Sequence, residues 1–321
     1  MIIWIAFIAL VIVLLALDLG IFHKSPHAVS TREALGWTTV WIAISLAFSA
    51  VVYYIYENAW GTNPEGLTGR QAVLEYLTGY VIEKSLSMDN IFVMAVIFAY
   101  FKIPRPYQHR VLFWGILGAI VFRGIMIGVG VVLIQKFEWI IYLFGALLLY
   151  SAYKMLTSGH EDIEPNKNPV ILVIRRFFPV TSQFEGEQFF IKKRNVRAAT
   201  PLFVALMVIE TSDIMFAVDS IPAIFAITRD PFLIFTSNIF AILGLRSMYF
   251  VLAAVLDKFQ YLKYSLVFIL AFVGIKMLIS NYIHIPAWIS LTVILVALTA
   301  GVVFSWSSYQ AMRTAEKEKG F

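Results

Sequence analysis

Nine apolar runs, each about as long as a membrane-spanning helix, constrain this chain more than any other feature. A helix needs about 20 residues to cross a hydrocarbon core of roughly 30 Å. Hydrophobic residues make up 60% of the chain and charged residues only 14%, whereas soluble domains are about half apolar and about a quarter charged. The sequence therefore predicts an all-α polytopic membrane protein with about nine transmembrane helices in a lipid bilayer. The runs lie near residues 2–22, 36–56, 73–100, 111–134, 138–156, 201–227, 232–256, 262–281 and 286–308.

The distribution of Lys and Arg between alternate loops predicts the orientation of the chain. One set of loops carries seventeen of these residues, and the other set carries only Arg70, Lys136 and Arg229. Because cytoplasmic loops are enriched in Lys and Arg, we expect the N-terminus outside and the C-terminus in the cytoplasm. Topology then explains the net charge of +5, and no nucleic-acid partner is expected.

The chain repeats itself on the two sides of a polar connection at 157–199. "FEWIIYLFGALLLYSAYKMLTS" from Phe137 matches "FQYLKYSLVFILAFVGIKMLIS" from Phe259 without a gap. Each copy has three spans, and the second copy begins on the opposite side of the membrane, so the copies are predicted to be inverted. Inverted repeats with a midplane site are typical of secondary transporters. The predicted organisation is a two-helix segment at 1–56, a first repeat at 73–156, a cytoplasmic loop at 157–199, a second repeat at 201–281 and a final helix at 286–308.

Five carboxylates lie inside these apolar runs. Each acidic residue at a helix centre costs about 2.5–3.5 kcal/mol to insert if it faces lipid, so we expect all five to face the bundle interior. One alignment of the copies pairs Glu83 with Asp213 and Asp89 with Asp219, whereas a rival alignment places Asp89 opposite Asp213. The acids could pair with buried arginines as static braces, or they could form a cation path. They are Glu83, Asp89, Glu210, Asp213 and Asp219.

Helical spacing predicts which of these side chains share a face. Glu83, Ser87 and Asn90 are separated by nearly whole turns, whereas Asp89 lies about 120° away from Glu83. Asp219 lies about half a turn from Glu210 around the helix. Pro222 cannot donate to the carbonyl of Val218 and clashes with it, so local unwinding there could turn Asp219 inward. A plain proline kink that serves packing is the alternative.

Two arginines, Arg123 and Arg246, lie near the centres of equivalent spans. They could pair with the carboxylates of an empty site and be displaced by a cation, or they could be static braces. Lys154 and Lys276 lie towards helix ends and are expected to snorkel to the interface. Asp18, near the end of the first span, has either a helix-end role or a place in a vestibule.

The candidate ligands are hard oxygen donors. The chain has no cysteine, and its histidines lie in loops or at span ends. Sites rich in oxygen suit Mn²⁺, Mg²⁺ or Ca²⁺ rather than Zn²⁺ or Cu⁺. No nucleotide-binding GxxxxGK[ST] loop is present, so we expect neither a nucleotide partner nor direct drive by ATP.

The motifs "EKSLSMDNIFV" and "ETSDIMFAVDSIPAIFAIT", together with "TSNIFAILGLRSMYF" and "GIKMLI", resemble the TerC family, which is named for tellurium resistance. The resemblance covers nearly the whole chain. It implies a bacterial inner-membrane protein grouped with LysE-type exporters, with manganese export as its activity and no resident cofactor. It also implies metal-binding roles for the motif positions Glu83, Asp89, Asn90, Glu210, Asp213 and Asp219.

The leading functional hypothesis is a secondary transporter, not an enzyme, that exports Mn²⁺ in exchange for H⁺ carried by the same carboxylates. An intramembrane hydrolase that uses paired aspartates is the first alternative. The chain contains neither the Gly-Asp signature nor the Gly-x-Ser-Gly signature of intramembrane proteases, which argues against this alternative. A membrane assembly factor that docks partners through 157–199 is the second alternative.

Overall fold

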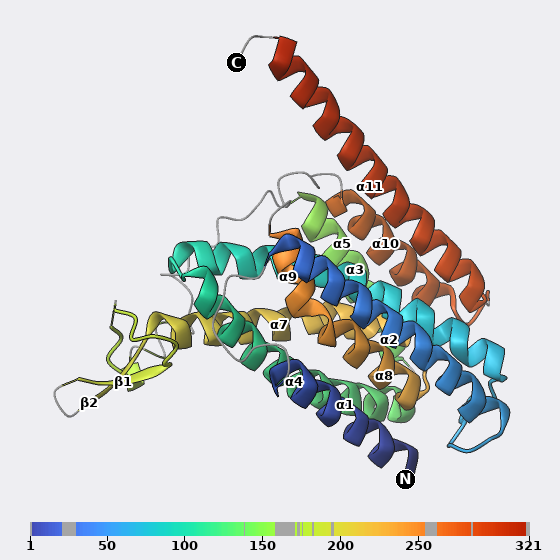
Figure 1. Cartoon of the computed structure of the whole chain (residues 1–321). Coiled ribbons are helices and arrows are strands. Elements are labelled where there is room, and N and C mark those ends of the chain that lie inside the picture. The colour runs from blue at the N-terminus through green and yellow to red at the C-terminus, as the bar shows by residue number, and fades with distance from the viewer. Residues whose placement is uncertain are drawn as a thin grey trace.

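The structure is a computed structural model dominated by long helices (Figure 1). It describes residues 2–20, 30–137, 139–157, 171, 174, 176–181, 183–193, 196–253, 262–283 and 285–318. The helices are α1 (Ile2–Gly20), α2 (Thr31–Glu57), α3 (Gly69–Tyr100), α4 (Arg105–Lys136), α5 (Ile140–Thr157), α7 (Pro201–Phe225), α8 (Pro231–Leu243), α9 (Leu245–Leu252), α10 (Leu262–Ile279) and α11 (Ala287–Glu318).

The number of helices that satisfy the criteria for a membrane span is smaller than the nine predicted. Among the described residues, six helices are long and apolar enough, and α8 and α9, bent by 44° at Gly244, would make a seventh. The 32-residue α3 carries five charged residues, and α1 is a shorter apolar helix. A multi-pass membrane protein is therefore supported, whereas the count of nine stays a prediction.

Local sequence explains where several helices begin. Thr68 and Gln71 form a capping box at the start of α3, in which each side chain bonds the backbone of the other residue. Asp230 caps α8 by accepting from the backbone N–H groups of Phe232 and Leu233. Pro201 occupies the first turn of α7, where its missing N–H costs nothing.

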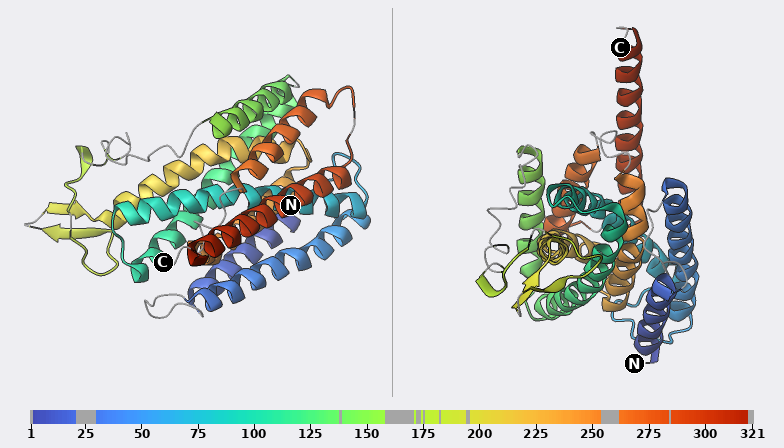
Figure 2. Two further views of the ribbon diagram at one scale, coloured as in Figure 1. Left: turned by 90° about the horizontal axis from the view of Figure 1, so that it is seen from above. Right: turned by 60° about the vertical axis from the view of Figure 1, so that its left-hand side comes forward.

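Helix α3 lies at the centre of the bundle and contacts α2, α7, α8, α9 and α11. Figure 2 shows the same bundle from two further directions, and its right-hand view shows the C-terminal part of α11 extending beyond the other helices. Much of α3 is buried, including the side chains of Tyr76, Glu83 and Asn90. The acidic motif of the first repeat is therefore placed inside protein rather than against lipid.

Each helix of the first predicted repeat packs against its counterpart in the second. In α3 and α7, Asn90 bonds Asp213 while Gly79 lies beside Ile224. Residue numbers therefore rise along one helix as they fall along the other, so these two helices are antiparallel.

The other two helix pairs are antiparallel as well. Tyr142 near the start of α5 accepts a hydrogen bond from Asn281 just beyond the end of α10, and Leu149 further along α5 lies beside Gly274. Helices α4 and α8 are also antiparallel. Its Ile116 and Ala119 cluster with Ile242, whereas its Gly124 lies beside Phe235.

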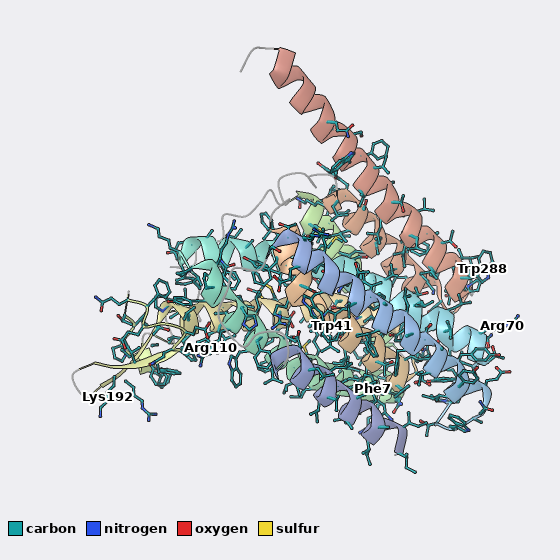
Figure 3. All side chains as sticks on the ribbon, viewed as in Figure 1. Phe7, Trp41, Arg70, Arg110, Lys192 and Trp288 are labelled. Atoms are coloured by element: carbon teal, nitrogen blue, oxygen red, sulfur yellow. The ribbon has the colours of Figure 1, made fainter. Side chains whose placement is uncertain are left out.

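A small antiparallel hairpin of β1 (Phe190–Lys193) and β2 (Val196–Ala199) lies just before α7. It projects from one end of the bundle, and Figure 3 places Lys192 and Arg110 at that end, with Arg70 and Trp288 at the opposite end. The sequence assigns Lys192 and Arg110 to the basic side of the membrane and Arg70 to the other. Residues 158–170 of the predicted 157–199 loop lie outside the described residues.

Candidate functional site

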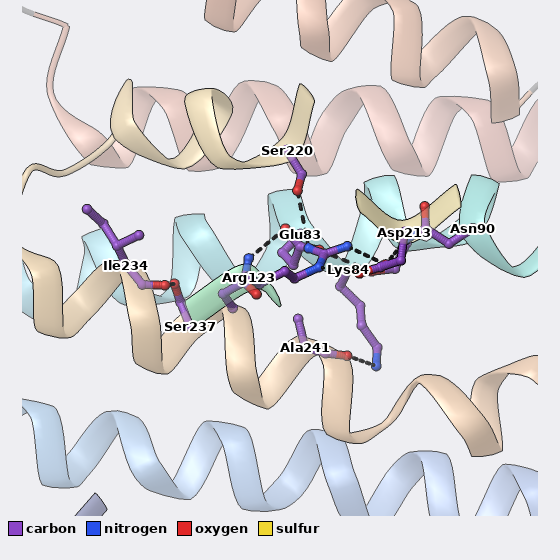
Figure 4. Close-up of polar contacts among 11 residues, drawn as sticks. Glu83, Lys84, Asn90, Arg123, Asp213, Ser220, Ile234, Ser237 and Ala241 are labelled. Carbon is purple, nitrogen blue, oxygen red and sulfur yellow. Dashed lines mark hydrogen bonds and ion pairs between the residues drawn. The ribbon is translucent and has the colours of Figure 1, made fainter. Parts of the chain in front are cut away.

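Arg123 of α4 is the centre of the buried charge network (Figure 4). Its side chain is 1% exposed. Its Nε and Nη2 donate to the two carboxylate oxygens of Asp213 on α7, at 3.1 and 2.9 Å. Its Nη1 forms an ion pair with Glu83 on α3 and also donates to Ser220 Oγ at 3.2 Å. One guanidinium thus joins a carboxylate from each of the two predicted repeats, and both roles expected for Arg123, the displaceable partner and the static brace, include such pairing.

Amide and hydroxyl groups complete the bonding of these two acids. Asn90 Nδ2 donates to Asp213 Oδ1 at 3.1 Å, and Asn238 Nδ2 from α8 donates to Glu83 Oε2 at 3.0 Å. Ser87 is within 3.5 Å of Glu83 on the same face of α3. The shared face of Glu83, Ser87 and Asn90 that the spacing predicted is therefore present.

Asp89 and Asp219 reach a cavity beside this network. The cavity has a volume of about 20 Å³, and its lining includes Glu83, Asn90, Arg123 and Ser220 as well as the two aspartates. That volume is enough for about one water molecule. Asp219 also accepts a hydrogen bond from Ser151 on α5, at 2.6 Å. Three acids and one base therefore line the cavity, which gives it an excess of negative charge.

Two lysines approach these aspartates from outside the cavity lining. Lys263 of α10 is close enough to Asp89 to attract it, and Lys154 of α5 is close enough to attract Asp219. Both lysines come from the third helices of the predicted repeats. They show that the negative charge of the two aspartates is partly balanced before any ion enters.

Glu210 does not join the Arg123 network. It lies one turn before Asp213 on α7, but its carboxylate faces Gly118 of α4, where a Cβ atom would come within 2.0 Å of it. Its Oε2 has no hydrogen-bond partner among the described residues. A side chain at position 118 would force this carboxylate to move.

The expected unwinding at Pro222 is wrong. Helix α7 continues through Pro222 to Phe225, and the carbonyl of Pro222 still accepts from the N–H of Ala226. Asp219 lines the cavity from this continuous helix and accepts a hydrogen bond from Ser151 of α5. The break in the second repeat lies instead at Gly244, between α8 and α9.

Arg246 does not pair with the motif acids among the described contacts. It forms an ion pair with Asp18 of α1, and its Nη1 donates to His109 Nε2 of α4 at 2.9 Å. The static-brace role fits Arg246, which ties the first helix to the bundle. Of the two roles expected for Asp18, this ion pair near the end of α1 fits the helix-end interaction.

Sequence reasoning missed two polar residues next to the network. Asn238 bonds Glu83, and Lys84 donates from Nζ to the carbonyl of Ala241 at 3.1 Å (Figure 4). That carbonyl lies just before the α8–α9 break, where helix carbonyls lose their intrahelical partners. The sequence did hold a signal for both residues, since Asn238 and Lys84 are polar side chains inside apolar runs.

The arrangement places a guanidinium where the two repeats contribute opposing carboxylates. Among the described residues, no group of three or more Asp, Glu, His or Cys side chains is gathered closely enough to hold a metal ion. Glu83, Asn90, Asp213 and the cavity-lining Asp89 and Asp219 surround Arg123 instead. A cation could bind these oxygen atoms only if Arg123 moved away.

Comparison with known proteins identifies the family. The model of the "Integral membrane protein TerC family" matches residues 68–314. The chain belongs to the TerC family.

Curated relatives match it along almost its full length. An uncharacterized membrane protein of Myxococcus xanthus, STKORF319, is 48% identical over 302 residues, 94% of this chain and 91% of that protein. The putative membrane-bound redox modulator Alx of Salmonella typhi is 45% identical over 309 residues, 96% of this chain and 95% of that protein. Alx of Escherichia coli K12 is 43% identical over the same length. No solved structure matches the chain.

Proposed function

We propose that this TerC family protein is a secondary transporter, not an enzyme, that exports divalent cations, with Mn²⁺ as its substrate and H⁺ as the exchanged ion. The observation that carries the proposal is the buried Arg123, bonded to Glu83 from one predicted repeat and Asp213 from the other. A side-chain cation bound between two repeats supports the proposal, because it can neutralise the carboxylates of a midplane ion site while the substrate is absent.

The mechanism follows from competition between Arg123 and the substrate ion. A divalent ion that enters beside Asp89 and Asp219 offers two positive charges to the carboxylates of Glu83 and Asp213, whereas Arg123 offers one. Carboxylate and amide oxygens are hard ligands, which favour Mn²⁺ over soft metals. Displacement of the guanidinium would loosen the contact between α3, α4 and α7. Ion occupancy would thus be coupled to conformation.

Protons provide a counter-ion at the same groups. Once the metal ion leaves, the carboxylates that Arg123 does not neutralise can take up protons from the opposite side. Asp89 and Asp219 are the candidates, because the described hydrogen bonds of Arg123 go to Glu83, Asp213 and Ser220. The proton therefore has its own carriers while Arg123 holds the other two acids.

We infer that the two three-helix units are inverted repeats. The antiparallel packing of α3 on α7, α4 on α8 and α5 on α10 supports this inference, because an axis in the membrane plane reverses the direction of every equivalent helix. The contacts also support the alignment of Glu83 with Asp213. In that alignment Asn90 is equivalent to Ser220. Asp213 bonds Asn90, and Glu83 shares Nη1 of Arg123 with Ser220.

The proposed location rests on the family and on the charge distribution. We propose the bacterial inner membrane, with the N-terminus outside and the C-terminus and the β1–β2 hairpin in the cytoplasm. The separation of Arg110 and Lys192 from Arg70 in Figure 3 supports this orientation. Several relatives are named as redox modulators, but this chain has no cysteine. A redox effect of its own would have to come through something other than thiol chemistry.

Ion movement in sealed vesicles tests the proposal. The purified protein in liposomes should move Mn²⁺ without any protein partner, and a pH gradient of the correct sign should accelerate that movement. Parallel assays with Ca²⁺ and Mg²⁺ establish the substrate order. Protein-dependent hydrolysis of a membrane peptide without ion flux would favour the hydrolase. Absence of both activities would favour the assembly factor.

A further inference from the structure

A second polar cavity lies where α7 and α10 end. It has a volume of about 390 Å³, and it is distinct from the small cavity at Arg123. Glu75 on its wall precedes Glu83 by eight residues of α3, which is roughly 12 Å along the helix. Its polar and charged lining residues are Glu65, Glu75, Thr228, Arg229, Lys276 and Ser280.

Glu75 is a buried carboxylate, and one of its oxygens is an unpaired hydrogen-bond acceptor among the described residues. Its side chain is 9% exposed, and its Oε2 has no hydrogen-bond partner among the described residues. Thr228 lines the same cavity beside Glu75. Since an unpartnered buried carboxylate oxygen is costly, this oxygen is a strong acceptor for an ion or its hydration water in the cavity.

The ends of two helices add to the negative potential. Helix α7 ends at Phe225 and helix α10 at Ile279, and residues from both ends line the cavity. The helix dipole is negative at a helix C-terminus, although the carbonyls of Ile224 and Ile279 already accept from backbone N–H groups of the turns that follow. Glu65, in the loop between α2 and α3, contributes a further carboxylate and accepts a hydrogen bond from the backbone N–H of Arg229 at 2.5 Å.

A lysine supplies the positive charge of this cavity. Lys276 is 8% exposed and donates to Ser290 of α11 at 3.0 Å. It is close enough to Glu75 to interact with its charge. The snorkelling expected for Lys276 is therefore wrong, and a buried ammonium faces the cavity instead. Arg229, the other basic residue of the lining, is exposed.

We propose that this cavity is a second cation site, which holds a hydrated divalent cation at Glu75, and that the Lys276 ammonium competes with this ion. A place for this site at the outer end of an export path rests on the proposed transport function. The binding of the cation itself does not depend on that function. At about 30 Å³ for each water, the cavity has room for roughly a dozen water molecules. An ion that keeps its waters fits there without the cluster of three ligating side chains that a dehydrated ion would need.

Binding of Mn²⁺ to the purified full-length protein tests the proposal. Equilibrium dialysis and the electron paramagnetic resonance signal of Mn²⁺ give the number of bound ions and their affinities. Removal of the carboxylate charge in Glu75→Gln should weaken one class of sites by about tenfold or more, and Lys276→Met should strengthen the same class by a similar factor. Glu57→Gln is the matched control, because it removes an acid beside Gly69 and outside this cavity. It should leave the number of bound Mn²⁺ ions and all their affinities unchanged.

The opposite signs of the two changes separate ion binding from a structural role, since a structural role gives no reason for Lys276→Met to tighten binding. Unchanged Mn²⁺ affinity in folded Lys276→Met and Glu75→Gln overturns the proposal. If Glu75→Gln does not fold, unchanged affinity in Lys276→Met alone overturns it. A chain that binds Mn²⁺ at Glu75 but moves no ion in liposomes would refute the transport function and leave this site standing.

Discussion

The substitution Glu83→Gln removes one of the two carboxylates that hold Arg123. Glu83 is fully buried and Arg123 is 1% exposed, so bulk solvent does not compensate for the lost carboxylate charge. Loss of one partner from a buried ion pair costs roughly 3–5 kcal/mol. Because Arg123 keeps two hydrogen bonds to Asp213, we expect a loss at the lower end, about 3 kcal/mol. A glutamine oxygen can still accept from Asn238, so the shape of the site is retained.

Thermal unfolding of the detergent-solubilised protein measures this loss. A destabilisation of about 3 kcal/mol should lower Tm by roughly 4–5 °C, because the entropy of unfolding scales with the 321 residues of the chain. Glu210→Gln is the matched control, because it removes a buried carboxylate whose Oε2 has no partner and breaks no described ion pair. Its Tm should be unchanged or higher. A wild-type Tm for Glu83→Gln, or an equal loss in both variants, would refute the assignment of Arg123 as the centre of the network.

Three further predictions concern packing and topology. Lys84→Met leaves the carbonyl of Ala241 unpaired at the α8–α9 break, which should cost about 1–3 kcal/mol and appear as a lower Tm. Gly145→Leu should reduce the yield of folded protein, because a Cβ atom there would come within 3.1 Å of the backbone oxygen of Gly274; Gly128→Leu, where a Cβ atom meets nothing within 4 Å, should be tolerated. Because the chain has no cysteine, Gln183→Cys reports the side of the hairpin segment directly. An impermeant thiol reagent should not label it in intact cells, and labelling from outside would contradict the topology.

The helical framework follows from the sequence because apolar runs of span length have few alternatives. Each of the nine predicted ranges overlaps described helices, although residues 21–22, 138 and 254–256 lie outside the described part of the chain. The turn chemistry at Thr68 and Asp230 explains where two of the helices start. The bend at Gly244 was not predicted, because a single glycine in an apolar run carries no unambiguous sign of a break. The β1–β2 hairpin was not predicted either, since its strands are only four residues long.

The site was predictable where helical spacing alone decides it. The shared face of Glu83 and Asn90 follows from the period of the helix, and the burial of the motif follows from the cost of charge in lipid. Helical spacing did not predict which carboxylates the two arginines would pair with. Arg123 and Arg246 look equivalent in the sequence, but only Arg123 lies between α3 and α7, whereas Arg246 lies against Asp18 of α1. Such choices depend on how helices cross, which one sequence does not specify.

Transport of Mn²⁺ by variants of the two cavity aspartates tests the central claim most directly. Asp89→Asn and Asp219→Asn keep the shape of the side chains, and neither aspartate is among the described hydrogen-bond partners of Arg123. Both variants should therefore reach the membrane in wild-type amounts. In liposomes the wild-type protein should move Mn²⁺, and both variants should lose that movement. Normal Mn²⁺ flux in both variants, or loss of folded protein in place of loss of flux, would contradict the account.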